Sequence, residues 1–444
     1  MTAFPVSGDV SGVRQCGERG MDLAGAWQHG VAAAGELGLT FTLDPVPETD
    51  PGAWECVLYR DGRQVPGGRG SGKGDEPAAR VGALFEALEH HLTATLPDTD
   101  EVVLCSARQI AAGPLRGEAV ARLLAEGPDE PLACLPYRSL SDDSQELLVP
   151  VFLNVPDYLN DSRRTAAARY ADAYPYTGVC RYAMNNGWAA GATWAEALVH
   201  ALNEIIERDA MSLLLIEQFL PPAPEPGSLR VVEPTALPGR LQQLHQSAQS
   251  RLKAPVHLLE ATTDLDVPVF WAYTPAPPGT PARTRGAGAS LSRAYAAERA
   301  LSELIQIHSC ASRPAAQAAQ AARPATGRTR SYPALHRCHL ADFSRHLPDA
   351  TTVAFPDHPT PATPQGHLHN LLHKLARRGY TAYARAHHLS DHLSVCNVIV
   401  PGLERFVLVA DDMPVLPGTR GNAHHHRPRP AQTDTAPGAP LPAV

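Results

Sequence analysis

The sequence lacks a long apolar run, an excess of positive charge and paired cysteines. No stretch approaches the ~20 apolar residues that a membrane-spanning helix needs, and residues 1–9 have neither the basic nor the apolar region of a secretion signal. The 46 acidic residues outnumber the 38 basic ones, which gives a formal charge of −8 and no electrostatic footprint for nucleic acid. The eight cysteines are spread singly, so neither a disulfide framework nor a zinc finger is indicated. We therefore expect a cytoplasmic protein without a membrane or nucleic-acid partner.

Proline is concentrated in a few segments, and the rest of the 444 residues carries regular hydrophobic patterns. The proline-rich segments, predicted as loops and a tail, are residues 221–238, 275–281, 348–364 and 414–442. Runs rich in β-branched and aromatic residues predict strands at 54–59, 147–155, 256–261, 267–273 and 406–410. Apolar residues at helical spacing predict helices at 24–36, 78–92, 194–216, 294–308 and 367–378. Because strands and helices are interleaved, we expect a mixed α/β or α+β fold.

The patterns divide the chain into three parts. Residues 1–53 are predicted to form a segment of helix and strand that packs on the main domain, which covers residues 54–414. Residues 415–444 are rich in proline and histidine and have almost no large apolar side chains after Leu416. Such a segment cannot bury enough surface to offset its ordering entropy, so a disordered tail is expected.

Three of the predicted helices carry polar, mostly acidic faces opposite their apolar stripes. These faces hold Gly82, Glu86 and Glu89 on helix 78–92, Glu196, His200, Asn203, Glu204 and Glu207 on helix 194–216, and Arg299, Glu303 and Gln306 on helix 294–308. One polar face alone is typical of any surface helix. Three such faces, however, predict a shared acidic site if the helices meet.

The segment before the first of these helices, residues 67–74, is rich in glycine and includes Lys73. It predicts a loop whose backbone N–H groups approach an anion, although Lys73 is followed by Gly74 and the segment is not a Walker A motif. Glutamates packed at close quarters repel one another, and bound cations relieve that repulsion. Carboxylate oxygens select Mg²⁺, and Arg208 and Arg299 suit a phosphate clamp. We therefore hypothesise an ATP–Mg²⁺ site built from helix faces.

At these residues the sequence resembles the YcaO family. The matching stretches are residues 72–74 (GKG) with 82–89 (GALFEALE), residues 186–193 (NGWAAGAT) running into 204–209 (EIIERD), Arg299 with Glu303, and residues 401–404 (PGLE). The motifs stand in the family's order, and the resemblance extends over about residues 54 to 410.

The resemblance implies a YcaO-like α+β fold in which a nucleotide binds between helix faces and sheets. It also implies an ATP- and Mg²⁺-dependent cyclodehydratase that acts on a ribosomal precursor peptide. A Cys, Ser or Thr side chain attacks the preceding carbonyl, ATP phosphorylates the oxyanion, and phosphate leaves to give a thiazoline or oxazoline. The implied metal ligands are Glu86, Glu89, Glu204, Glu207 and Glu303. The implied nucleotide-binding residues are Lys73, Gly82, Glu86, Asn186, Glu196, Arg208, Arg299, Glu303 and Gln306.

A few positions depart from the family pattern. Gly82 stands where the family usually has Ser, His90 where it has Arg, and Ala192 where some members have Asn. A basic residue near the N-terminus contacts nucleotide in some members, and Arg19 is its counterpart here. Many azoline-forming members end in a PxPxP tail that reaches the active site. The corresponding candidates here are Pro440, Pro442 and Val444.

The resemblance also implies partners. A fused peptide-capturing domain is not visible in the sequence, so we expect a separate leader-binding protein, a flavin-dependent dehydrogenase in azole pathways, and an oligomer or multi-enzyme complex. Three alternatives stay open, since the attacking nucleophile comes from the substrate or a partner. In the first alternative the enzyme forms thioamides, and in the second it forms amidines. In the third, the chain is a non-catalytic scaffold that has kept the fold.

Overall fold

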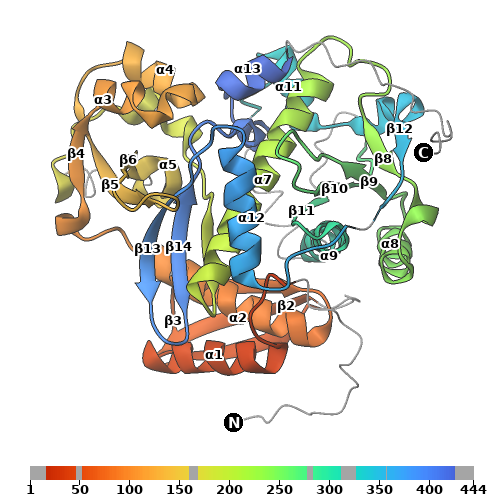
Figure 1. The fold of residues 1–444 in the computed structure, drawn as a ribbon, viewed down its shortest axis with the longest axis horizontal. Coiled ribbons are helices and arrows are strands. Elements are labelled where there is room, and N and C mark those ends of the chain that lie inside the picture. Colours follow the sequence, from red (N-terminus) through yellow and green to blue (C-terminus); the bar gives the residue numbers. More distant parts are fainter. Residues whose placement is uncertain are drawn as a thin grey trace, which may run out of the picture.

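In the computed structural model, the described residues form three β-sheets, each covered by one long helix with a carboxylate face. The structure describes residues 17–46, 53–159, 169–277, 284–311, 327–356 and 358–425. In Figure 1, α7 runs through the middle of the view, with α2 beneath it and α9 to its right. The described part of the chain is thus a mixed α+β fold, as the sequence predicted.

The first sheet lies near the N-terminus. Its strands, in the order β1 (Thr40–Pro45), β2 (Ala53–Arg60) and β3 (Arg63–Lys73), are antiparallel. Helix α2 (Glu76–Thr93) packs on β3 and β2, and α1 (Leu23–Glu36) packs on α2. Because β1 pairs with β2, the predicted N-terminal segment shares a sheet with the main domain.

The second sheet has five strands. Their order is β11 (Arg285–Ala289), β10 (Val269–Tyr273), β9 (His257–Glu260), β8 (Arg230–Val232) and β12 (Thr351–Val353). Helix α9 (Arg293–Ala311) packs on β11 and β10, and α8 (Gly239–Leu252) packs on α9. The pair β8 and β12 is parallel, whereas the other pairs are antiparallel.

The third sheet is antiparallel and has six strands. It runs β4 (Val103–Ser106), β5 (Pro131–Ser139), β13 (Tyr383–Leu389), β14 (Ser394–Ile399) and β7 (Trp188–Gly191), and β6 (Glu146–Pro150) pairs with β5. Helix α7 (Trp194–Phe219) packs on β7 and β14. The other α-helices of the described residues are α3 (Ala107–Ala112), α4 (Ala119–Glu126), α5 (Val151–Asn154), α11 (Pro333–Leu340), α12 (Pro364–Ala376) and α13 (Thr419–His425).

Side-chain hydrogen bonds satisfy backbone groups at the ends of the long helices. The side chain of Asp75 accepts a hydrogen bond from the Ala78 N–H at the start of α2, and Thr193 accepts one from the Glu196 N–H at the start of α7. These N-caps satisfy N–H groups that have no partner within the helix. At the other end of α7, the Arg337 guanidinium donates to the carbonyl oxygens of Phe219 and Leu220, at 3.1 Å each.

The glycine-rich residues 67–74 are not the predicted anion-binding loop, because all but the last belong to strand β3. A Cβ at Gly72 would collide with the backbone of Ala79 on α2, and one at Gly70 with the backbone of Ala83. The glycines therefore let α2 lie directly against the strand. Gly286 and Gly288 on β11 likewise allow α9 to lie directly against that strand. Close helix–strand contact explains this glycine-rich composition.

We predict that Gly72→Ala lowers the free energy of unfolding by about 1–3 kcal/mol, because the added methyl group forces α2 away from β3. Chemical denaturation measures the loss. Gly35→Ala on α1 is the matched control, since a Cβ there meets no atom within 4 Å. It is expected to leave stability unchanged or slightly raised. Equal stability of the two variants would contradict the packing role of Gly72.

Several predicted elements were wrong in type or extent. Residues 406–410 form the 3-10 helix Phe406–Asp411, because a short, fully buried apolar run does not distinguish strand from helix. The strand predicted at 147–155 ends at Pro150 and continues as α5. The proline-rich segments 221–238 and 348–364 contain β8 and β12, which were predicted as loops. Residues 415–425 pack on the body rather than joining a tail, and Val415 is fully buried.

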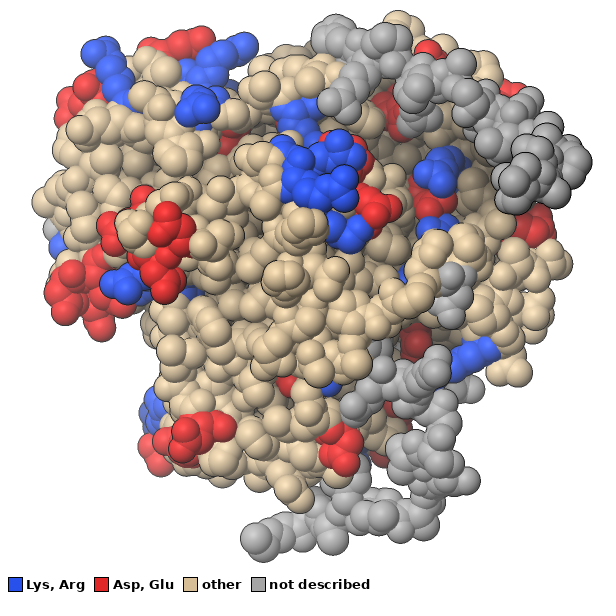
Figure 2. Space-filling view, viewed as in Figure 1, with Lys and Arg blue, Asp and Glu red and all other residues tan. Residues whose placement is uncertain are grey.

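The surface in Figure 2 carries lysine and arginine side chains interspersed with acidic ones, and most of this face carries neither. Among the described helices, none combines the length and the apolar character needed to cross a bilayer.

Candidate functional site

Five glutamates from three helices interact in one cluster. Glu86 and Glu89 come from α2, Glu204 and Glu207 from α7, and Glu303 from α9. The charge of Glu89 interacts with those of Glu204 and Glu86, and the charge of Glu207 interacts with those of Glu303 and Glu204. Lys73, at the end of β3, forms an ion pair with Glu303. The three sheets thus bring together the carboxylates that the helical projections placed on separate faces.

Burial and mutual repulsion destabilise the charged forms of these carboxylates when no cation is present. Burial, with the charge of Glu204 adding to it, raises the pKa of Glu89 to about 8. Burial, with the charge of Glu303 adding to it, raises the pKa of Glu207 to about 7. Burial also acts to raise the pKa of Glu303, but Lys73, Arg299 and the Ala287 N–H together outweigh it and the pKa is lowered. A cation among these carboxylates would favour their charged forms.

Backbone N–H groups before and within β7 orient two of the carboxylates. The Ala190 N–H donates to Glu89 over 2.8 Å, and the Gly187 N–H donates to Glu204 over 3.1 Å. Gly187 has φ of +74°, and a Cβ there would collide with the Val398 carbonyl oxygen. Arg208 donates to the Asn185 carbonyl oxygen over 2.7 Å and lies 3.4 Å from Glu204.

A second group of polar side chains surrounds His200 on α7. Burial, followed by the positive charges of Arg299, Arg19 and Lys73, holds the pKa of His200 well below its usual range. Burial acts to lower the pKa of Arg299, but Tyr295 and nearby carboxylates outweigh it and raise the pKa. The result is a region of positive charge beside the glutamate cluster.

Glu196 belongs to this second region. It is 3% exposed and accepts hydrogen bonds from the Gly20 N–H at 2.7 Å and the Ala192 N–H at 3.3 Å, with Arg19 at 3.9 Å. Glu196 therefore anchors residues 19 and 20 beside α7. His200 was predicted on the polar face of this helix without a role, although its spacing of four residues from both Glu196 and Glu204 was a usable signal. Arg19 stands outside any periodic element, so only the resemblance pointed to it.

The remaining predicted site residues do not all join these groups. Asn186 is buried and lines a small pocket with Ile205 and Glu404. Gly82 is exposed and lies next to Gly72 of β3. A Cβ added at Gly82 would lie 3.4 Å from the Cα of Gly72, so the position has room for a side chain. Gln306 is half-buried on α9, three residues beyond Glu303. Pro440, Pro442 and Val444 lie outside the described residues.

The donor set fits Mg²⁺ chemically, since it consists of carboxylate oxygens whose negative charge is under-compensated. Within the described residues, no three carboxylate, imidazole or thiol side chains stand close enough together to hold one ion as they are. The fit therefore rests on the kind and charge of the donors.

Comparisons with known proteins identify the family of this chain and relatives of its fold. A family model described as YcaO cyclodehydratase, binding ATP and Mg²⁺, matches residues 71–404. Among curated protein sequences, none matches this chain significantly.

Solved structures share the fold at low sequence identity. A heterocyclase in complex with substrate and cofactor aligns over 87% of this chain and 53% of its own, with 17% identity and a TM-score of 0.60. This chain thus spans about half the length of that heterocyclase. YcaO from Methanopyrus kandleri, bound with AMPPCP and Mg²⁺, aligns over 90% and 96%, with 19% identity and a TM-score of 0.59. The E. coli microcin synthetase McbBCD complex with pro-MccB17 bound aligns over 82% and 88%, with 10% identity and a TM-score of 0.52.

Proposed function

Because the chain belongs to the YcaO family, we propose that it is an ATP- and Mg²⁺-dependent cyclodehydratase that acts on backbone amides of a ribosomal precursor peptide. Its products would be thiazoline or oxazoline rings. The observation that carries the proposal is the convergence of five glutamates from three helices beside a group of cationic side chains.

In this proposal the two regions of the site have different tasks. Glu86, Glu89, Glu204, Glu207 and Glu303 hold Mg²⁺ through oxygen ligands. Arg299, Arg208 and Lys73 face the phosphates, where the guanidinium groups can donate in pairs. ATP, when bound, would supply the phosphoryl group that turns an amide oxygen into a leaving group. The chain itself contributes position and charge neutralisation, which dominate phosphoryl-transfer catalysis.

The substrate class and partners are part of the proposal. The McbBCD complex named above contains pro-MccB17, which supports a precursor peptide as substrate and a multi-subunit assembly. A separate leader-binding protein and a flavin-dependent dehydrogenase remain the partners we expect. Thioamide or amidine formation is the alternative, because the attacking nucleophile comes from the substrate or from a partner.

The experiment that tests the proposal incubates the protein with ATP, Mg²⁺, and any precursor peptide and leader-binding protein that its neighbouring genes encode. Cyclodehydration removes one water from the peptide per ring, and intact-mass spectrometry detects that loss together with ATP consumption. Thioamidation would instead replace oxygen by sulfur without loss of water from the backbone. An unchanged peptide and unchanged ATP, with all components present, would favour the non-catalytic scaffold.

A further inference from the structure

The C-terminal helix α13 lies beyond the residues that the family model matches, yet it packs against α7. Figure 1 shows it next to the upper end of α7. Its residue Arg420 is only 9% exposed, although arginine is seldom buried unless it is paired. The contacts of this side chain therefore indicate what α13 does in the molecule.

The guanidinium of Arg420 uses all five of its N–H donors. Its Nε and Nη2 donate to the two carboxylate oxygens of Asp209, over 2.8 and 3.0 Å. Its Nη2 and Nη1 donate to the two carboxylate oxygens of Asp264, over 2.6 and 3.4 Å. Its Nη1 also donates to the hydroxyl oxygen of Tyr380, over 3.1 Å. Paired donation of this kind requires a guanidinium, since an ammonium group offers only a point charge.

Asp209 connects this clamp to the candidate site. It is fully buried on α7 and follows Glu207 and Arg208 directly in the chain. A buried carboxylate is strongly destabilised without a partner, so the position of this helical turn depends on Arg420. Without the fork, Asp209 would lose its charged partner while keeping the Glu404 N–H donor, and a shift of its carboxylate would displace the adjoining Glu207 and Arg208.

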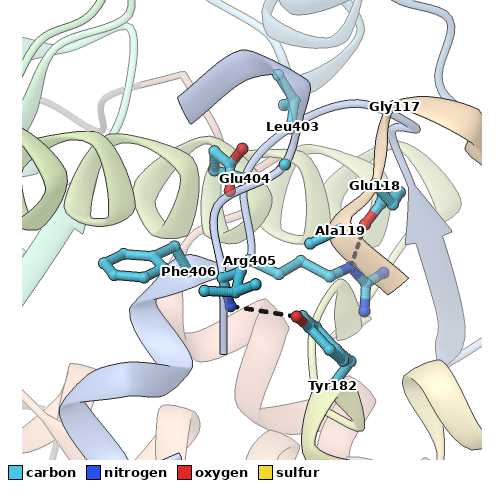
Figure 3. A pocket seen from close by; sticks show the side chains of 10 residues that line it. Gly117, Glu118, Ala119, Tyr182, Leu403, Glu404, Arg405 and Phe406 are labelled. Atoms are coloured by element: carbon cyan, nitrogen blue, oxygen red, sulfur yellow. Dashed lines mark hydrogen bonds and ion pairs between the residues drawn. The ribbon is translucent and has the colours of Figure 1, made fainter. Parts of the chain in front are cut away.

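A second set of hydrogen bonds closes the arrangement into a ring. The Glu404 N–H donates to Asp209 over 2.9 Å, and the Glu404 carboxylate accepts from the Gly421 N–H over 2.8 Å. The contact is close, since a Cβ at Gly421 would lie 3.0 Å from that carboxylate oxygen. Figure 3 shows Glu404 beside Arg405, whose guanidinium pairs with Glu118 at 3.4 Å, and all three residues line a small pocket. Helix α7, the loop after β14 and α13 are thus joined at Asp209.

We propose that Arg420 is a positioning residue of the candidate site: by clamping Asp209, it fixes the turn of α7 that carries Glu204, Glu207 and Arg208. The inference rests on the proposed function, because it assigns Arg420 an effect on nucleotide binding. In this proposal, helix α13 is part of the structural unit that forms the candidate site.

The test uses the full chain with Arg420→Lys, which keeps the charge and loses the fork. The affinity for ATP in the presence of Mg²⁺, measured by calorimetry, is expected to fall about fivefold, within the range of substitutions that act on a site from outside it. Amide hydrogen exchange of residues 203–212 without nucleotide is expected to become faster. Asp264→Asn leaves the pairing with Asp209 in place and should show the same changes in weaker form, which covers the case that Arg420→Lys does not fold.

Arg385→Lys on β13 is the matched control. The Arg385 side chain is 10% exposed and pairs with Glu101. The variant therefore measures how much stability is lost when a buried guanidinium away from α7 is replaced. It should lower thermal stability without changing ATP affinity or exchange at residues 203–212. Wild-type affinity and exchange in both Arg420→Lys and Asp264→Asn would overturn the inference. A wild-type chain that does not bind ATP would refute the proposed function instead, and the exchange measurement would still decide the positioning role.

Discussion

Glu207→Gln is expected to lower Mg²⁺-dependent ATP turnover by about 100-fold or more while leaving the protein folded. The substitution removes one negative oxygen ligand and nearly preserves the side-chain volume. Burial and the charge of Glu303 raise the pKa of the Glu207 carboxyl to about 7, which means that its charged form is unfavourable in the fold. Removing that charge should therefore leave the melting temperature the same or raise it. Phosphate release with the peptide substrate present, together with thermal melting, measures both effects.

Glu217→Gln provides the control for this prediction. Glu217 lies on the same helix, beyond the cluster, so the same chemical change should leave turnover intact. Wild-type turnover by Glu207→Gln would reject the assignment of Glu207 to the metal. Glu204→Gln should behave like Glu207→Gln, because Glu204 interacts with both Glu89 and Glu207.

Arg299→Lys should weaken ATP binding by about 1–3 kcal/mol, because lysine keeps the charge but cannot donate in pairs to a phosphate. Arg299 lies among Tyr295, Glu207 and Glu303, at the border between the acidic cluster and the cationic region. Calorimetric titration with ATP and Mg²⁺ measures the change.

Two further variants provide a second test and a control for that result. Arg208→Lys tests the second proposed phosphate contact, which in this structure pairs with Glu204. Arg122→Lys changes an exposed residue of α4 and should leave binding unaltered. Unchanged affinity in Arg299→Lys would assign Arg299 to structural ion pairs with the neighbouring glutamates.

The helices that carry the site could be predicted because their signals are local. The apolar stripes of α2, α7 and α9 repeat at helical spacing, and Leu84, Leu202 and Leu301 are fully buried as that spacing requires. The carboxylates then follow on the opposite faces. Since like charges at close quarters repel one another, these faces by themselves favour a bound cation wherever the helices meet.

The function of the glycines could not be predicted in the same way. Glycine permits both unusual backbone angles and close packing, so residues 67–74 were compatible with an anion-binding loop and with a strand. Which one holds depends on what lies opposite. Here that is the backbone of Ala79 and Ala83 on α2, a contact that exists only in the folded molecule.

The sequence by itself thus determined the fold class, the three acidic helices and the family resemblance, because each depends on neighbours a few residues apart or on motifs in order. The tertiary structure alone decided that Asn186 turns inward and that His200 lies among three cations. It also decided that Arg420 pairs with Asp209 and Asp264, which are 211 and 156 residues away in the chain. Contacts over such separations leave no periodic trace in the sequence, since they form only when distant elements pack together.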